Sequence, residues 1–250
     1  MLRSLNSLTG YKIKTKDSTI GHVDEFYFDD EKWSIRYLVV DTGTWLPGKR
    51  VLIAPAAFLG SPDWESRTFP IILTKEMVKE SPPIDTNKPV SRRKETELLK
   101  YYNWPLYWKV KARGPLPSAY APTEVFMPRG AKAPVPEEGE ETHIRSTREV
   151  TGYHIQANDG GIGHIDDFII DDSDWSVRYV VIDTRNWLPG KRVLIAPSWI
   201  REISWVESKM YVDLSRETIK SSPAYDPSKP VNRKYEERLY DYYGRPTYWD

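Results

Sequence analysis

DTGTWLPGKRVLIAP, residues 41–55, recurs as DTRNWLPGKRVLIAP at residues 183–197, with 13 of 15 positions identical. The correspondence continues outwards on both sides of this stretch. The offset is 142 residues before it and 141 residues after it, from Thr9-Gly10-Tyr11 paired with Thr151-Gly152-Tyr153 to Tyr107-Trp108 paired with Tyr248-Trp249. The chain therefore contains two copies of one unit, and this period is too long for a solenoid.

The repeat divides the chain into three parts. We expect repeat 1 to cover residues 1–110 and repeat 2 to cover residues 143–250, with a linker at residues 111–142. The linker contains six prolines and three glycines and closes with a cluster of glutamates. Such a composition is typical of an extended segment between domains.

Each repeat has the pattern of a small β-rich domain. Residues 21–28 and 33–40 have strand character, and the polar turn at residues 29–32 predicts that they form a hairpin. Further strands are predicted at residues 50–54 and 69–73. A type II turn is predicted before the first of these, because proline at 47 fixes the first φ angle and glycine at 48 accepts the positive second one.

The end of each repeat changes to helical character. Thr74 and Ser215 are predicted N-caps of a short helix, and Ser91 and Asn232 are predicted N-caps of a second helix. Five or six short strands followed by short helices predict a mostly β fold. We expect two small, strongly bent sheets or barrels in tandem, each with a helical appendage.

Three ordered segments carry a family resemblance. They are Gly21-His-Val-Asp-Glu-Phe26, Trp33-Ser-Ile-Arg-Tyr-Leu-Val-Val-Asp41 and Val51-Leu-Ile-Ala-Pro55, and each recurs in repeat 2 with few changes. In this order they resemble the PRC-barrel family, which includes the cytoplasmic domain of the photosynthetic reaction centre H subunit and the C-terminal domain of the ribosome maturation factor. Residues 45–55 and 89–108 resemble a bacterial stand-alone subgroup. The resemblance implies small β-barrels used for assembly and binding, without shared catalytic residues.

Composition excludes several classes of function. The 36 basic and 36 acidic side chains give zero net charge, so no positive excess attracts the chain to nucleic acid or anionic lipid. The absence of cysteine excludes disulfides, thiolate metal sites and a cysteine nucleophile. We find no phosphate-binding loop, nucleotide fingerprint or nucleophile motif, and no apolar run that could cross a bilayer. We therefore expect a cytoplasmic protein without a cofactor or a membrane span.

The two His-x-Asp strands are the candidate metal or catalytic residues. His22 and Asp24, and their equivalents His164 and Asp166, are predicted to share one strand face, and both residue types are suitable zinc or iron ligands. Two ligands do not complete a site, and Phe26 continues the same face. The structural interpretation is therefore favoured: no metal and no catalytic residue are expected, and a metal-binding protein or enzyme is the alternative.

The turns supply the candidate interaction residues. These are Trp45, Lys49 and Arg50 in repeat 1 and Trp187, Lys191 and Arg192 in repeat 2. Tryptophan and arginine are enriched at interface hot spots, although a plain turn with the tryptophan folded onto the domain also explains them. The leading hypothesis is a non-catalytic module that binds a protein partner, or whose repeats pair with each other as a pseudo-dimer. RNA or ribosome association is the weaker alternative, because one dibasic pair per repeat is little against zero net charge.

Overall fold

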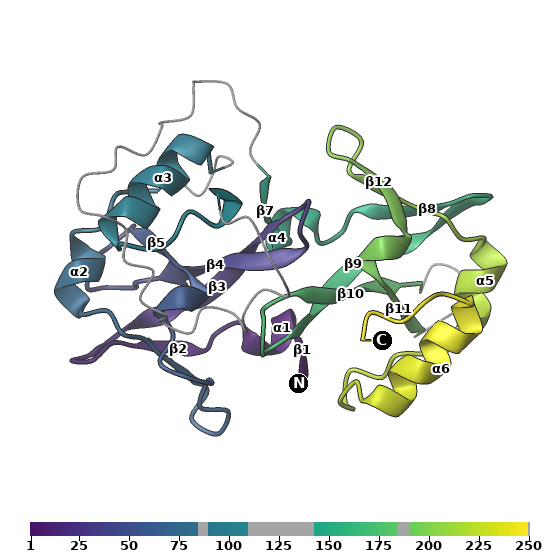
Figure 1. The fold of residues 1–250 in the computed structure, drawn as a ribbon, viewed down its shortest axis with the longest axis horizontal. Coiled ribbons are helices and arrows are strands. Elements are labelled where there is room, and N and C mark those ends of the chain that lie inside the picture. The colour runs from purple at the N-terminus through teal and green to yellow at the C-terminus, as the bar shows by residue number, and fades with distance from the viewer. Residues whose placement is uncertain (85–89, 110–142, 185–190, 250) are drawn as a thin grey trace. The chain divides into compact units, whose positions relative to one another are not determined.

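The computed structural model describes residues 1–84, 90–109, 143–184 and 191–249, so the predicted linker lies outside the described part. The fold is mostly β, as predicted, with 37% of the described residues in strands and 24% in helices. The strands form one six-stranded and one seven-stranded sheet (Figure 1). None of the described helices is long and apolar enough to cross a membrane.

The chain divides into two compact units. The first, here called the repeat 1 unit, comprises Leu8–Ser146 together with Ser173–Trp175. Its strands are β2 (Lys12–Lys14), β3 (Thr19–Asp29), β4 (Ser34–Asp41), β5 (Arg50–Ile53), β6 (Thr68–Pro70) and β7 (Ile144–Ser146). Its helices are η1 (Pro55–Ala57), α2 (Lys75–Lys79), α3 (Arg92–Tyr101) and η2 (Tyr107–Lys109). The sheet order is β5-β4-β3-β2-β6, and β7 also pairs with β3.

The second unit, here called the repeat 2 unit, comprises Met1–Ser7, Thr147–Asp172 and Ser176–Asp250. Its strands are β1 (Leu2–Ser4), β8 (His154–Ala157), β9 (Gly160–Asp171), β10 (Val177–Asp183), β11 (Arg192–Ile195), β12 (Ile200–Ser204) and β13 (Lys209–Val212). Its helices are α4 (Thr147–Val150), η3 (Pro197–Trp199), α5 (Arg216–Ser221) and α6 (Arg233–Tyr243), while α1 (Leu5–Leu8) follows β1. The sheet order is β11-β10-β9-β8-β13-β12, and β1 also pairs with β9.

The predicted hairpin and turns are confirmed. The Asp29 carboxylate accepts hydrogen bonds from the backbone of Glu31 and Lys32, at 3.1 and 2.9 Å, and so closes the turn between β3 and β4. The predicted type II turn is present in repeat 1, where Lys49 N donates to Leu46 O and Gly48 has a φ of 74°. The corresponding turn of repeat 2 lies outside the described residues.

The predicted helix starts are also confirmed. Each of the four expected caps accepts a hydrogen bond from a backbone N–H in the first turn of its helix. The caps are Thr74 for α2, Ser91 for α3, Ser215 for α5 and Asn232 for α6. These side chains satisfy N–H groups that have no partner within the helix.

The predicted two-residue alternation along residues 21–28 is wrong, because β3 contains a bulge. Val23 pairs with Val40 and Glu25 pairs with Val39, which leaves Asp24 as the extra residue. The bulge shifts the following side chains to the interior, so that Glu25 and Phe26 are both buried. Asp166 is the extra residue at the equivalent place in β9.

The long central strand of each unit has one edge that its own repeat covers only in part. In the repeat 1 unit, β4 covers one edge of β3, and β2 covers the other edge only along Thr19–His22. Further along the same edge, Tyr27–Asp29 pairs with β7, which belongs to repeat 2 in sequence. A free edge presents unpaired N–H and C=O groups, and β7 supplies partners for them.

The same exchange occurs in the opposite direction. In the repeat 2 unit, β8 covers the edge of β9 along Gly160–His164, and β1 from repeat 1 covers Ile169–Asp171 (Figure 1). The contacts thus assign residues 1–7 to the repeat 2 unit and residues 143–146 to the repeat 1 unit, whereas the predicted domain boundaries follow the sequence repeat. Each unit is completed by a strand of the other repeat.

The tip of the β9–β10 hairpin also belongs to the repeat 1 unit. Trp175 is 4% exposed, and its carbonyl oxygen accepts a hydrogen bond of 2.8 Å from Ile35 N. Its ring lies 5.1 Å from Phe58 and 5.9 Å from Phe69, measured between ring centroids. A tryptophan of repeat 2 thus fills part of the aromatic core of the other unit.

A charge-reversal cycle tests the exchange. Arg3 Nε donates to Asp172 at 3.1 Å, and the equivalent Arg145 Nε donates to Asp30 at 3.0 Å. We expect Arg3→Asp to lower stability by about 1 kcal/mol, which lowers the Tm by about 2–4 °C for a chain of this size. Asp172→Arg should restore it. Rescue by Asp30→Arg instead would mean that β1 pairs within its own repeat.

Candidate functional site

The two predicted sets of site residues meet in one ion pair in each unit. Arg50 Nη2 lies 3.2 Å from Asp24 Oδ2, and Arg192 Nε lies 2.7 Å from Asp166 Oδ2. The aspartate of each His-x-Asp strand is therefore paired with the arginine of the following turn. The candidate metal ligands and the candidate interaction residues occupy the same place.

A glycine brings these strands close enough for the pair to form. Gly21 has a φ of 148°, and a Cβ there would overlap the carbonyl oxygen of Asp41. Gly163 has the same relation to Asp183. A side chain at this position would push β3 away from the end of β4, next to which Arg50 lies in the ladder. The glycine is required because two backbones touch.

The histidines of these strands are placed apart from a ligand cluster. His22 is exposed and lies opposite Lys12 and Asp41, whereas His164 is half-buried and lies opposite His154 and Asp183. In the described part of the chain, no group of three or more histidine or acidic side chains is arranged to hold a metal ion. A metal at Asp24 or Asp166 would also have to displace a guanidinium group.

The turn lysines bind the ends of the short helices. Lys49 Nζ donates to the carbonyl oxygens of Lys79 and Ser81, at 2.7 and 3.0 Å, where α2 ends. Lys191 Nζ donates to the carbonyl oxygen of Lys220 in α5. Burial lowers the pKa of both lysines. A cation at a helix C-terminus satisfies carbonyl groups that lack intrahelical partners.

Trp45 combines a structural bond with an accessible face. Its Nε1 donates to Ile20 O at 2.5 Å, and the Lys75 ammonium lies 4.8 Å from the ring centroid. The half-buried ring lines a surface cavity of about 360 Å³, together with Asp17, Lys75, Glu76 and Lys79. Its counterpart Trp187 lies outside the described residues.

Two further polar sites, which sequence reasoning missed, hold the exchanged strands. The β9 docking site consists of Asp167 and Asp172 beside the edge of β9, and the β3 docking site consists of Glu25 and Asp30 beside the edge of β3. Ser4 Oγ donates to Asp167, and Ser146 Oγ donates to Glu25. The sequence contained one sign that these two short segments are equivalent, because Arg3-Ser4 recurs as Arg145-Ser146 at the repeat offset.

The carboxylates under the two serines are buried. Glu25 and Asp167 are each 6% exposed. Burial raises the pKa of Asp167 to about 6, although hydrogen bonds from Ser4 and from the backbone of Phe168 and Asn6 favour the ionised form. A buried carboxylate needs such donors, because ionisation away from water is otherwise costly. The exchanged strand β1 provides part of the solvation of Asp167.

The pKa of Asp167 gives stability a defined pH dependence. The native state keeps the proton up to about pH 6, whereas an unfolded aspartate releases it near pH 4. Native protein therefore binds more protons in this window, and Asp167 makes stability fall as pH rises from about 4 to 6. Asp167→Asn should remove this component. The free energy of unfolding of the variant should therefore rise relative to that of the wild type as the pH increases from about 4 to 6. Urea unfolding at a series of pH values measures it. An unchanging difference between the two proteins would contradict the assignment, and the exposed Glu202→Gln serves as control.

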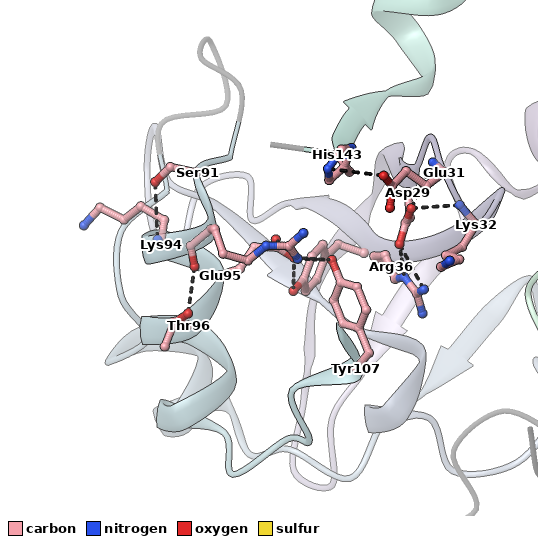
Figure 2. Close-up of polar contacts among 12 residues, drawn as sticks. Asp29, Glu31, Lys32, Arg36, Ser91, Lys94, Glu95, Thr96, Tyr107 and His143 are labelled. Carbon is pink, nitrogen blue, oxygen red and sulfur yellow. Dashed lines mark hydrogen bonds and ion pairs between the residues drawn. The ribbon is translucent and has the colours of Figure 1, made fainter. Parts of the chain in front are cut away.

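A buried glutamate ties the helical appendage of repeat 1 to its sheet. Glu95 of α3 is fully buried. Its Oε1 accepts from Tyr37 of β4 at 2.9 Å and from Tyr107 of η2 at 2.8 Å, and its Oε2 accepts from Arg92 at 3.1 Å. Figure 2 shows Glu95 and Tyr107 within this group of polar contacts. Burial raises the pKa of the Glu95 carboxyl group, whereas Arg92 and the two hydroxyl groups oppose that rise.

The same arrangement recurs in repeat 2. Glu236, which is 3% exposed, accepts from Tyr179 and Tyr248 at 2.8 Å each and pairs with Arg233 at 3.3 Å. An arginine of the sheet also stacks on each distal tyrosine: Arg36 lies 3.9 Å from the ring centroid of Tyr107, and Arg178 lies 4.4 Å from that of Tyr248. Every partner of the glutamate belongs to the fold, which is typical of a structural cluster.

Glu95→Ala tests the weight of this cluster. The substitution leaves two tyrosine hydroxyl groups and a guanidinium group without their common acceptor, and we expect a loss of about 3–5 kcal/mol in the free energy of unfolding. The matched control is Glu97→Ala, two residues along the same helix, where the side chain is 40% exposed. This substitution should change the free energy of unfolding by no more than about 0.5 kcal/mol. Similar losses for both variants in urea unfolding would contradict a special role for Glu95.

Comparison with known proteins identifies one segment. Residues 2–56 match the model of the PRC-barrel domain, and a search of the curated proteins found no match. The matched segment begins with β1, the strand that pairs with β9, and continues through β5 to η1. Part of this domain in sequence therefore lies in the repeat 2 unit in space. A PRC-barrel domain is thus present at residues 2–56 of this chain.

Proposed function

We propose that the chain is a non-catalytic assembly module built of two PRC-barrel repeats in tandem, which pair with each other as a pseudo-dimer and present a surface to a protein partner. The observation that carries the proposal is the reciprocal exchange of β1 and β7. Strand addition at a sheet edge is a common mode of recognition between polypeptides. Here each repeat uses it on the other.

The candidate polar residues already form ion pairs and hydrogen bonds within their own units, which supports a non-catalytic role. Asp24 and Asp166 are paired with arginines, and Glu95 is surrounded by donors from its own unit. A general acid or base must lie within hydrogen-bond reach of a substrate atom. These carboxylates instead use their acceptor positions to hold strands and helices together.

A surface around α2 suits a protein partner. Trp45 lines the cavity on this helix, and Met77 of the same helix is 37% exposed. Tyr101, also 37% exposed, donates from its hydroxyl group to Met77 O at 2.8 Å. Aromatic residues and methionine are enriched at interfaces. Repeat 2 has Thr218 at the position equivalent to Met77, so repeat 1 is the partner-binding repeat in this proposal.

The same contacts disfavour RNA or ribosome association. Phosphate binding requires free lysine and arginine side chains. Lys49 is bound to the end of α2, and Arg50 is paired with Asp24, so the dibasic pair is already occupied within its own unit.

Cleavage of the linker tests the pseudo-dimer. A protease recognition sequence placed within residues 111–142 allows the purified chain to be cut after folding. We expect the two fragments to elute together at the size of the intact chain, because each carries a strand of the other's sheet. Their Tm should become dependent on concentration.

The control is the same cleavage in a chain that carries both Arg3→Asp and Arg145→Asp. Its fragments should separate more readily, since the two charge reversals weaken both exchanged strands. Elution of the unsubstituted fragments as separate monomers at micromolar concentration would overturn the pseudo-dimer.

A further inference from the structure

The two exchanged strands dock in the same register. Leu2, Arg3 and Ser4 lie opposite Asp171, Ile170 and Ile169. Ile144, Arg145 and Ser146 lie opposite Asp29, Phe28 and Tyr27, the equivalent residues of β3. The backbone ladder supplies affinity without regard to sequence, and the side chains must therefore supply the specificity.

The side-chain contacts are also the same in both docking sites. The arginine of each strand donates from Nε to an aspartate: Arg3 to Asp172 and Arg145 to Asp30. The serine one residue further on donates to a buried carboxylate, which is Asp167 in one site and Glu25 in the other. Both sites thus bind an arginine side chain and the side chain of the serine that follows it.

Each contact also rejects the wrong residue. An acidic side chain in place of the arginine would face Asp30 or Asp172, which repels it. An alanine in place of the serine would leave a carboxylate that is 6% exposed without one of its donors, and an unsatisfied buried charge is costly. Selection by penalties of this kind gives a docking site its specificity.

We propose that the β9 and β3 docking sites are recognition sites of one shared specificity, for an extended segment of the pattern apolar-Arg-Ser. Their partner in trans is this strand donated by a repeat of a second copy of the chain. The proposal rests on the assembly function above and adds its specificity. Within one chain the two strands fill the two sites, and a strand displaced from one copy can be replaced by that of another.

Peptide binding to an emptied site tests the proposal. A chain without Met1–Ser7 leaves the β9 docking site open, and a labelled peptide of residues 1–8 is added to it. We expect binding by this peptide and also by a peptide of residues 143–150, because the two sites share their specificity. Peptides with Arg3→Asp or Ser4→Ala should bind at least about tenfold more weakly, the factor that corresponds to about 1.4 kcal/mol. The intact chain, with its site filled, is the control and should bind less.

The remaining outcomes are also decisive. If the shortened chain does not fold alone, the peptide of residues 1–8 should restore its cooperative unfolding transition, and failure to do so would overturn the proposal. Equal binding of the peptide and its two variants, or failure of the 143–150 peptide to bind, would also overturn it. The linker-cleavage experiment distinguishes failure of this proposal from failure of the pseudo-dimer. If the cleaved fragments stay together but the peptides do not bind as expected, the pseudo-dimer holds and the shared sequence specificity does not.

Discussion

An incompletely covered sheet edge is the constraint on which the rest of this structure depends. β3 and β9 are longer than the strands that their own repeats place beside them, and their last backbone groups need partners. A short strand from the other repeat provides these partners in both directions. The bulges at Asp24 and Asp166 lie along the same strands and turn the following side chains inwards. Glu25 and Asp167 thereby come to lie under the exchanged serines.

The buried charges of this protein select one arrangement among several that the hydrophobic pattern alone would allow. A buried ion pair contributes little net stability, because the desolvation of its charges offsets their attraction, but a broken one is strongly unfavourable. Asp167 accepts from the strand that completes its sheet, and Glu95 of α3 accepts from two other elements of its unit, β4 and η2. Misplacing any of these elements leaves a buried carboxylate without one of its donors. The apolar core gives the energy of folding, and these carboxylates define which segments meet.

Much of the local structure could be predicted from the sequence. Asp29 closes its own turn, Pro47 and Gly48 fix theirs, and the caps such as Ser91 satisfy the nearest helical N–H groups, so all these features depend on residues a few positions apart. The exchange could not be predicted, because the sequence pattern of β1 is the same whether it pairs with β3 or β9. The bulge at Asp24 escaped prediction for a related reason, since an extra residue in a strand is decided by the partner strand. The sequence offered Asp24 as a candidate metal ligand and Arg50 as a candidate interaction residue, but only the fold shows that these two side chains form an ion pair.

The exchange also sets an order of events during synthesis. The hydrogen bond between Ser4 and Asp167 joins residues 163 positions apart, so β1 cannot pair until the linker and the first part of repeat 2, through β9, have been made. Meanwhile the last residues of β3 remain uncovered until Ile144–Ser146 leave the ribosome. Chains with such distant pairings fold slowly. An uncovered strand edge on an incomplete chain can also pair with another nascent chain on the same messenger RNA. The nascent protein is therefore most prone to aggregate after its first repeat is complete and before its second has begun.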